Sequence, residues 1–278
     1  MKKILNLLKK LYIFFNKNIV KIETITQINY GEILKGKRVL ITGGTSGIGL
    51  ALAKKCLSEG AVVVITGRSP ERLKNISKEI SNKNLRVLEW NVKNISDIDV
   101  NIEKTISLIG RVDILFNNAG IYSDNKFLDV TEKEYDNILD TNLKSIFFIS
   151  QKIAEYFKNN KIKGKIINTV SIRGYQSTRE PYGISKWGLL GLTKGLAKEL
   201  AKDGIIVNGI APGITASGIN GIDMKKDISI NSTLDGRVAL PEEIAEIGCF
   251  LASNASNHII VRLLFVMEEK HCFKRRIN

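Results

Sequence analysis

TGGTSGIG, residues 42–49, decides the fold of this chain. The apolar run before it (38–42) has the pattern of a buried strand, and residues 48–58 after it have the pattern of a helix. Its glycines permit a tight turn and let backbone N–H groups approach an anion closely. A strand, a glycine-rich turn and a helix in this order predict a nucleotide pyrophosphate site. The expected contacts are Gly43, Thr45, Ser46, Gly47, Ile48 and Gly49.

Outward from this loop, strand-like and helix-like segments alternate with short connections. Residues 61–66 are wholly apolar and β-branched, as a strand buried on both faces should be. Strict alternation predicts an α/β fold with a doubly wound parallel sheet of the Rossmann type. The expected strands are 38–42, 61–66, 85–90, 112–116, 165–170 and 205–210, and the expected helices are 48–58, 70–81, 96–109, 131–158, 183–202 and 241–252.

The size and composition fit one soluble α/β domain. The chain has 278 residues, of which 44% are hydrophobic and 25% are charged. Its three widely spaced cysteines form neither a disulfide framework nor a metal pattern, so a cytoplasmic location and no metal site are expected. The only histidines, His258 and His271, lie near the end, which argues against a Ser-His-Asp hydrolase or a histidine-ligated zinc enzyme.

The net charge of +14 could indicate a nucleic acid or an anionic membrane as a partner. Most lysines are scattered singly and no aromatic-interleaved basic patch occurs, so we expect no nucleic-acid partner. Basic residues gather at the two ends of the chain, most clearly in residues 274–276.

Residues 4–17 have the pattern of an amphipathic helix with one apolar and one basic face. Lys9 and Lys10 interrupt the apolar run, so it is too short to span a membrane. Such a helix would suit a membrane surface, or it would dock on its own domain or on a partner subunit. We divide the chain into this N-terminal segment with its connector (1–35), the main domain (36–256) and a C-terminal tail (257–278).

The second chemical motif is YGISK, residues 182–186. A lysine four residues after a tyrosine lies on the same face of a helix. The ammonium of Lys186 is therefore expected to favour the phenolate of Tyr182, whose ordinary pKa is about 10. Tyr182 could then donate a proton to a carbonyl oxygen or accept one from an alcohol.

In order and spacing, TGGTSGIG, NNAG (117–120) and YGISK resemble the short-chain dehydrogenase/reductase family, including its 3-oxoacyl reductases, over about residues 36–256. The resemblance implies hydride transfer between a nicotinamide and a carbonyl or secondary alcohol. It also implies that Ser171 orients the substrate oxygen and that Asn142 holds a water that relays protons from Lys186. Family members are commonly homodimers or homotetramers, built on the helices that bear Asn142 and Tyr182.

The resemblance also assigns the cofactor contacts. At the end of the second strand, Gly67 replaces the acid that would bind the hydroxyls of NAD, and Arg68 follows it, so NADP(H) is expected to be preferred over NAD(H). For Asn117 a structural role between strands is expected. The further cofactor residues implied are Asn91, Val92, Asn118, Ala119, Gly120, Pro212, Gly213 and Ser217, together with Tyr182 and Lys186.

The sequence does not rank the substrates. Residues 172–181 (IRGYQSTREP) are polar and would line the substrate cleft, which suits a polar or anionic substrate. Residues 214–237 are rich in Gly, Ser and Asn and would form a mobile lid. A 3-oxoacyl thioester, a keto-sugar and another small polar ketone stay open.

The resemblance ends at the C-terminus. Where the family has a Gly-Gln, a short strand and V-D-G-G, this chain reads IVRLLFVMEEKHCFKRRIN (260–278). We therefore expect the strand that closes one edge of the sheet to be lost. A shift of reading frame near codon 260 is our explanation, and a divergent genuine tail is the alternative. A chain without that strand could be a non-catalytic, nucleotide-binding descendant that acts as an interaction protein.

Overall fold

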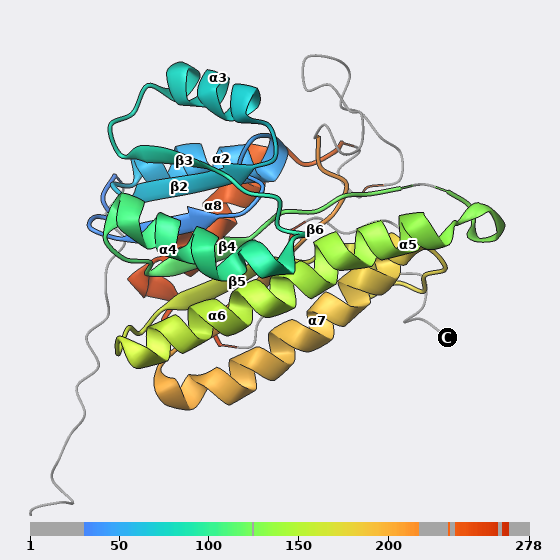
Figure 1. The fold of residues 1–278 in the computed structure, drawn as a ribbon. Coiled ribbons are helices and arrows are strands. Elements are labelled where there is room, and N and C mark those ends of the chain that lie inside the picture. The colour runs from blue at the N-terminus through green and yellow to red at the C-terminus, as the bar shows by residue number, and fades with distance from the viewer. Residues whose placement is uncertain (1–30, 124, 217–232, 234–236, 261–262, 267–278) are drawn as a thin grey trace, which may run out of the picture.

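Seven parallel strands in the order β3-β2-β1-β4-β5-β6-β7 form the central sheet (Figure 1). The structure is a computed structural model that describes residues 31–123, 125–216, 233, 237–260 and 263–266. The order runs outward in both directions from β1 and β4, which is the doubly wound topology that the sequence predicts. The strands are β1 (Arg38–Ile41), β2 (Val62–Gly67), β3 (Leu85–Glu89), β4 (Ile114–Asn117), β5 (Lys165–Thr169), β6 (Ile206–Pro212) and β7 (Leu263–Val266).

Helices cover both faces of the sheet because successive strand residues point to opposite sides. Ile41 packs under α2 (Gly47–Ser58), α3 (Pro70–Ile80) and α8 (Pro241–Ala252). Its neighbour Leu40 belongs to the second core, with α4 (Ile98–Ile109), α6 (Ser145–Asn159) and α7 (Pro181–Leu200). The short turns are η1 (Ile95–Asp97), η2 (Phe127–Asp129), η4 (Ile172–Gly174), η5 (Ala201–Asp203) and η6 (Asn254–Ser256).

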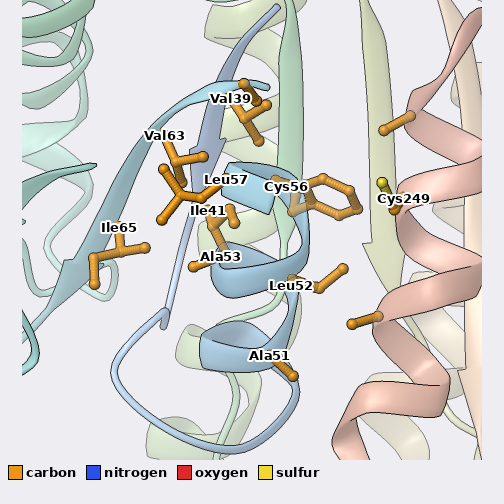
Figure 2. Close-up of a cluster of buried hydrophobic side chains, with 14 of the residues drawn as sticks. Val39, Ile41, Ala51, Leu52, Ala53, Cys56, Leu57, Val63, Ile65 and Cys249 are labelled. Atoms are coloured by element: carbon orange, nitrogen blue, oxygen red, sulfur yellow. The ribbon is translucent and has the colours of Figure 1, made fainter. Parts of the chain in front are cut away.

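Helices α2 and α8 face each other across a cluster of buried apolar side chains (Figure 2), and their close packing requires a glycine. A Cβ atom on Gly248 would lie 2.4 Å from Cδ2 of Leu52. Cys56 and Cys249 are buried in this core as free thiols. Both therefore act as small apolar side chains that join the two helices.

The long helix expected over 131–158 contains a local irregularity. It comprises α5 (Glu132–Leu139), the five-residue π turn η3 (Asp140–Lys144) and α6. The Ser145 N–H donates to the Asp140 carbonyl, five residues back instead of four. π turns of this kind occur frequently at functional sites, and this one contains Asn142.

The expectation that the edge strand is lost is wrong. Leu263–Val266 pairs in parallel with β6, and Leu264 packs against the core. The reason is physical: four consecutive apolar residues suit a buried edge strand whatever the family motif was. A descendant without this strand is therefore excluded, while the frame-shift hypothesis stays a prediction about the gene.

The N-terminal connector reaches the domain just before β1. The Gly31 N–H donates to the Glu59 carboxylate (2.9 Å), and Leu34 is fully buried. The predicted amphipathic helix, 4–17, lies outside the described residues. Within the part of the chain that the structure describes, no helix is long and apolar enough to cross a membrane.

Candidate active site

The glycine loop lies directly against the segment that follows β4. Gly43 has a left-handed backbone (φ +67°), and a Cβ on it would lie 2.8 Å from Cα of Ala119. A Cβ on Gly49 would lie 2.2 Å from the Gly43 carbonyl oxygen. Larger residues would therefore push the loop away from the sheet edge, as the glycine pattern predicts.

The loop ends at the N-terminus of α2, which is built to receive an anion. Ser46 is the N-cap, and its side chain makes no capping hydrogen bond. The first turn of the helix carries no acidic residue. The unpaired N–H groups and the helix dipole therefore offer a positive site beside the loop. A nicotinamide dinucleotide fits this chemistry through its pyrophosphate.

Thr42 and Asn118 fasten the loop in place. The backbone N–H groups of Asn118 and Ala119 donate to the Thr42 hydroxyl (3.1 and 3.2 Å). The Asn118 amide in turn donates to the carbonyls of Thr42 (3.2 Å) and Gly43 (3.0 Å). Sequence reasoning found Asn118 and missed Thr42, although its position inside TGGTSGIG was a usable signal.

The two asparagines of NNAG have different tasks. The Asn117 amide donates to Ser150 Oγ and to Asn168 Oδ1, both at 2.9 Å. It thus ties β4 to β5 and to α6, which confirms the structural role predicted for it. Gly120 faces Asn142: a Cβ on it would lie 3.4 Å from Asn142 Oδ1.

The carboxyl ends of β2 and β3 bring Gly67 and Arg68 close to Asn91 and Val92. Gly67 packs on the loop, because a Cβ there would lie 2.5 Å from Thr45 Cγ2. Arg68 is exposed beside it. The Gly67 carbonyl accepts from the Trp90 N–H (2.9 Å), which brings Asn91 and Val92 to the same edge. Asn91 is exposed and Val92 is buried.

The far side of the site lies at the end of β6. Pro212 is the last residue of the strand, and the Gly213 carbonyl accepts from the Thr215 hydroxyl (3.1 Å). Thr215 also forms a β-bridge with Ala239. Ser217 and most of the predicted lid lie outside the described residues.

Tyr182 and Lys186 lie on the first turns of α7, which begins with Pro181 as a proline-first helix should. The Lys186 Nζ is 5.6 Å from the centroid of the Tyr182 ring. It donates to the carbonyl of Thr169, the last residue of β5, at 2.8 Å. Ser171 follows this strand end and is buried. Helix α7 and the end of β5 thus bring Tyr182, Lys186 and Ser171 together.

Burial dominates the protonation of this group. It raises the pKa of Tyr182, while a hydrogen bond with Ser171 and the positive charge of Arg173 act in the opposite direction. Burial also lowers the pKa of Lys186 to about 8. Burial sets the direction of the Tyr182 shift, so its pKa lies above the ordinary value in the protein alone, and the expected support of the phenolate by Lys186 stays a prediction. Tyr182 is protonated at neutral pH and is prepared to act as an acid.

Asn142 is fully buried in the π turn. Its Oδ1 accepts from the Ile121 N–H and its Nδ2 donates to the Ile121 carbonyl, both at 2.8 Å. The side chain also donates to Ser185 Oγ (3.3 Å). These contacts join α7 and the chain after NNAG to the π turn, so Asn142 holds three parts of the site in register.

A cavity of about 450 Å³ opens beside Tyr182. The ring of Tyr122 lines it and meets the Tyr182 ring edge-on, with centroids 5.1 Å apart. Sequence reasoning missed Tyr122, because nothing in its local pattern points to Tyr182. The lining residues are Tyr122, Asn125, Lys126, Arg173, Ser177, Thr178, Arg179 and Glu180.

Known proteins resemble this chain in sequence and in fold. The sequence profile of the family described as short chain dehydrogenase matches residues 37–227. A 3-oxoacyl-[acyl-carrier-protein] reductase from Aquifex aeolicus is 35% identical over 241 residues, which cover 84% of this chain and 96% of that protein. The corresponding reductase of Haemophilus influenzae is 35% identical over 239 residues, or 84% of this chain and 97% of that one. A solved 3-ketoacyl-(acyl-carrier-protein) reductase from Brucella melitensis, complexed with NADH, has a TM-score of 0.77 at 30% identity, over 84% of this chain and 97% of that chain.

The fold, the motifs and these likenesses together define a nicotinamide-dependent oxidoreductase that acts on a carbonyl or alcohol group. The chain belongs to the short chain dehydrogenase family. The resemblance drawn from the motifs is thereby confirmed.

Proposed function

We propose that this chain reduces a 3-oxoacyl thioester to the 3-hydroxyacyl thioester with NADPH. The observation that carries the proposal is Tyr182, hydrogen-bonded to Ser171 and in ring contact with Tyr122, which lines the neighbouring cavity. A protonated tyrosine is the state needed for reduction, since the alkoxide that forms must receive a proton. The 3-oxoacyl reductases of Aquifex aeolicus and Haemophilus influenzae support this substrate over a keto-sugar.

The cofactor would lie along the carboxyl ends of the strands. Its pyrophosphate would rest on Gly43–Gly49 and the N-terminus of α2, and Arg68 would pair with the 2′-phosphate of NADPH. Asn91 and Val92 would border the adenine. NADPH supplies the hydride that the reaction adds to the carbonyl carbon. The residues proposed for the ribose and nicotinamide side are Asn118, Ala119, Gly120, Tyr182, Lys186, Pro212, Gly213 and Ser217.

The chain's own residues manage the oxygen atom and its proton. Ser171 would hydrogen-bond the substrate oxygen and fix its position. Tyr182 would transfer its hydroxyl proton to that oxygen as the C–O double bond becomes a C–O single bond. Lys186 would then restore the proton to Tyr182 through a water held near Asn142, where the π turn interrupts the regular helix hydrogen bonding.

The direct test measures NADPH oxidation by the purified chain with acetoacetyl thioester, a keto-sugar and a simple ketone, each repeated with NADH. We expect the thioester with NADPH to be turned over fastest. Faster turnover of the keto-sugar would contradict the proposal that a 3-oxoacyl thioester is the substrate. Equal rates with NADH would remove the role given to Arg68.

We also propose that the chain assembles as a homodimer or homotetramer through α5, α6 and α7. Large apolar side chains on these helices are unusually exposed: Tyr135 (41%), Phe147 (44%), Ile184 (39%) and Trp187 (46%). Large exposed apolar side chains on these three helices suit an interface. Light scattering after size exclusion should give a dimer or tetramer, and Phe147→Glu should release monomers. A monomeric wild-type chain would contradict the assembly.

For residues 4–17 we propose attachment of an otherwise cytoplasmic enzyme to anionic membrane surfaces, because basic and apolar residues fall on opposite faces. The full chain should sediment with vesicles containing phosphatidylserine, and a chain beginning at residue 21 should stay in solution. Equal behaviour of the two would leave docking on protein as the role of this segment.

A further inference from the structure

The wall of the cavity beside Tyr182 is built on α7. The Trp187 indole N–H donates to the Gln176 carbonyl (2.6 Å). Thr178 packs so closely over the helix that a Cβ on Gly183 would lie 1.9 Å from its Oγ1. A Cβ on Gly174 would lie 2.8 Å from the Lys186 carbonyl oxygen. The segment that carries the cavity's arginines is therefore fixed to the same helix as Tyr182 and Lys186.

Positive charge prevails in this cavity. Among its described lining residues, Lys126, Arg173 and Arg179 are basic and Glu180 alone is acidic. The Glu180 carboxylate accepts a hydrogen bond from the Arg179 backbone N–H (3.2 Å). Within the described parts of the chain, none of the three cations has a carboxylate within ion-pair distance. Among the described residues, the cavity thus presents three cationic groups and one carboxylate, and none of the three cations is paired with it.

Arg173 is the cation best placed to meet a substrate. Arg173 follows Ser171 by two residues in the turn η4. The backbone N–H of Arg173 donates to Ser171 Oγ (3.2 Å). It is half-buried, whereas Lys126 and Arg179 are exposed at the rim. Its charge also acts on Tyr182. A ketone held between Ser171 and Tyr182 would therefore place the atoms a few bonds away from its carbonyl near the guanidinium.

We propose that Arg173, assisted by Arg179 and Lys126, binds an anionic group on the acyl chain of the substrate, and that the preferred substrates are short 3-oxoacyl thioesters ending in a carboxylate. The inference rests on the proposed function. A guanidinium binds a carboxylate through two parallel hydrogen bonds, which fixes orientation as well as affinity. A long alkyl chain would instead remove water from these charges without pairing them, which is costly.

The test compares two thioesters of equal chain length, 3-oxoadipyl pantetheine and 3-oxohexanoyl pantetheine, which differ in the terminal carboxylate. We expect kcat/KM to favour the carboxylate by about tenfold or more, the effect of one charge-assisted pair. Arg173→Gln should reduce this ratio to near one, and Arg173→Lys should keep part of it. Arg111→Gln is the matched control: it removes an exposed arginine that pairs with Asp113 before β4, and it should preserve the ratio.

A fluorescence titration of each variant with NADPH checks that the cofactor site is still folded. Equal kcat/KM for the two thioesters, or a preference that survives in Arg173→Gln, would overturn the subsite and leave the proposed reductase intact. If NADPH binds and neither thioester is reduced, the proposed function fails and the subsite fails with it.

Discussion

Two buried lysines lie at opposite ends of strand β5, and only one of them has a part in the proposed mechanism. Lys165 begins the strand, and Lys186 on α7 contacts the carbonyl of Thr169, where the strand ends. Burial lowers the pKa of each to about 8, with a further contribution from Lys37 at Lys165. A lowered pKa therefore does not distinguish the two.

What separates them is the number of acceptors around each ammonium. Lys165 Nζ donates to the Leu251 carbonyl (3.2 Å), the Ser253 carbonyl (2.5 Å) and Ser256 Oγ (2.8 Å), which uses all three of its protons. Lys186 Nζ donates to one acceptor among the described residues. Lys165 thus clamps β5 to the end of α8, while Lys186 keeps donors that the proposed mechanism uses for the cofactor and for proton transfer.

The largest effect is expected at the Lys186 end of the strand. Tyr182→Phe removes the acid, so the rate of carbonyl reduction should fall about 10³-fold. NADPH affinity and melting temperature should change little, because the ring and its contact with Tyr122 remain. Stopped-flow NADPH oxidation measures the rate, and a loss below tenfold would show that another group supplies the proton.

At the other end, Lys165→Met should act on stability. It removes the charged donor from the carbonyls of Leu251 and Ser253, which keep weaker hydrogen bonds from Ser256, and we expect a loss of about 1–3 kcal/mol. Removal of a buried charge offsets part of this cost. Urea unfolding measures the free energy, and kcat should stay near the wild-type value. A variant with normal stability would mean that Lys165 is no clamp.

The pH dependence of the unfolding free energy should also distinguish Lys165→Met from the wild type. Because both lysines have a folded pKa of about 8 and an ordinary value of about 10.4, the unfolded chain binds more protons between these limits. The free energy of unfolding should therefore rise with pH across this window. In Lys165→Met one of the two groups is gone, so the rise between about pH 7 and about pH 9.5 should be smaller. An unchanged slope in urea titrations would contradict the lowered pKa of Lys165.

The smallest expected effect concerns the cofactor rim. Arg68→Gln should weaken NADPH binding by about tenfold and leave NADH binding unchanged, because a single exposed charge pair is lost. Fluorescence titration with both nucleotides measures the ratio, and Arg72→Gln on the nearby helix α3 is the matched control. Equal weakening of both nucleotides would place Arg68 away from the 2′-phosphate.

The cofactor side of the site could be predicted from the sequence because it depends on backbone conformations and close contacts that only glycine allows. Gly43 and Gly49 are required by contacts under 3 Å that no side chain would tolerate, and such requirements appear directly as glycines. The parallel, doubly wound sheet was predicted from the alternation of strands and helices. Even β7 could have been expected, had four apolar residues been weighed against the missing motif.

The substrate side of the site was harder to predict from the sequence because it depends on packing between segments that are distant in the chain. Arg173 enters the cavity only because Gly174 lets its turn lie on α7. The burial of Tyr182, which raises its pKa, follows only from the tertiary structure as well. Helical spacing places Lys186 on the same face as Tyr182, but it does not predict the hydrogen bond of Lys186 to Thr169. The clamp at Lys165 joins residues more than 80 positions apart and leaves no local pattern.

The most direct test of this account assays Lys186→Met and Lys165→Met side by side, for NADPH-dependent reduction and for thermal unfolding. Lys186→Met should lose about 100-fold or more in kcat, since proton transfer loses its support. Its melting temperature should fall less than that of Lys165→Met, because one hydrogen bond is lost instead of three. Lys165→Met should keep kcat and melt several degrees lower. Full activity of Lys186→Met, or loss of activity in both variants in proportion to their unfolding, would contradict the division of roles between the two ends of β5.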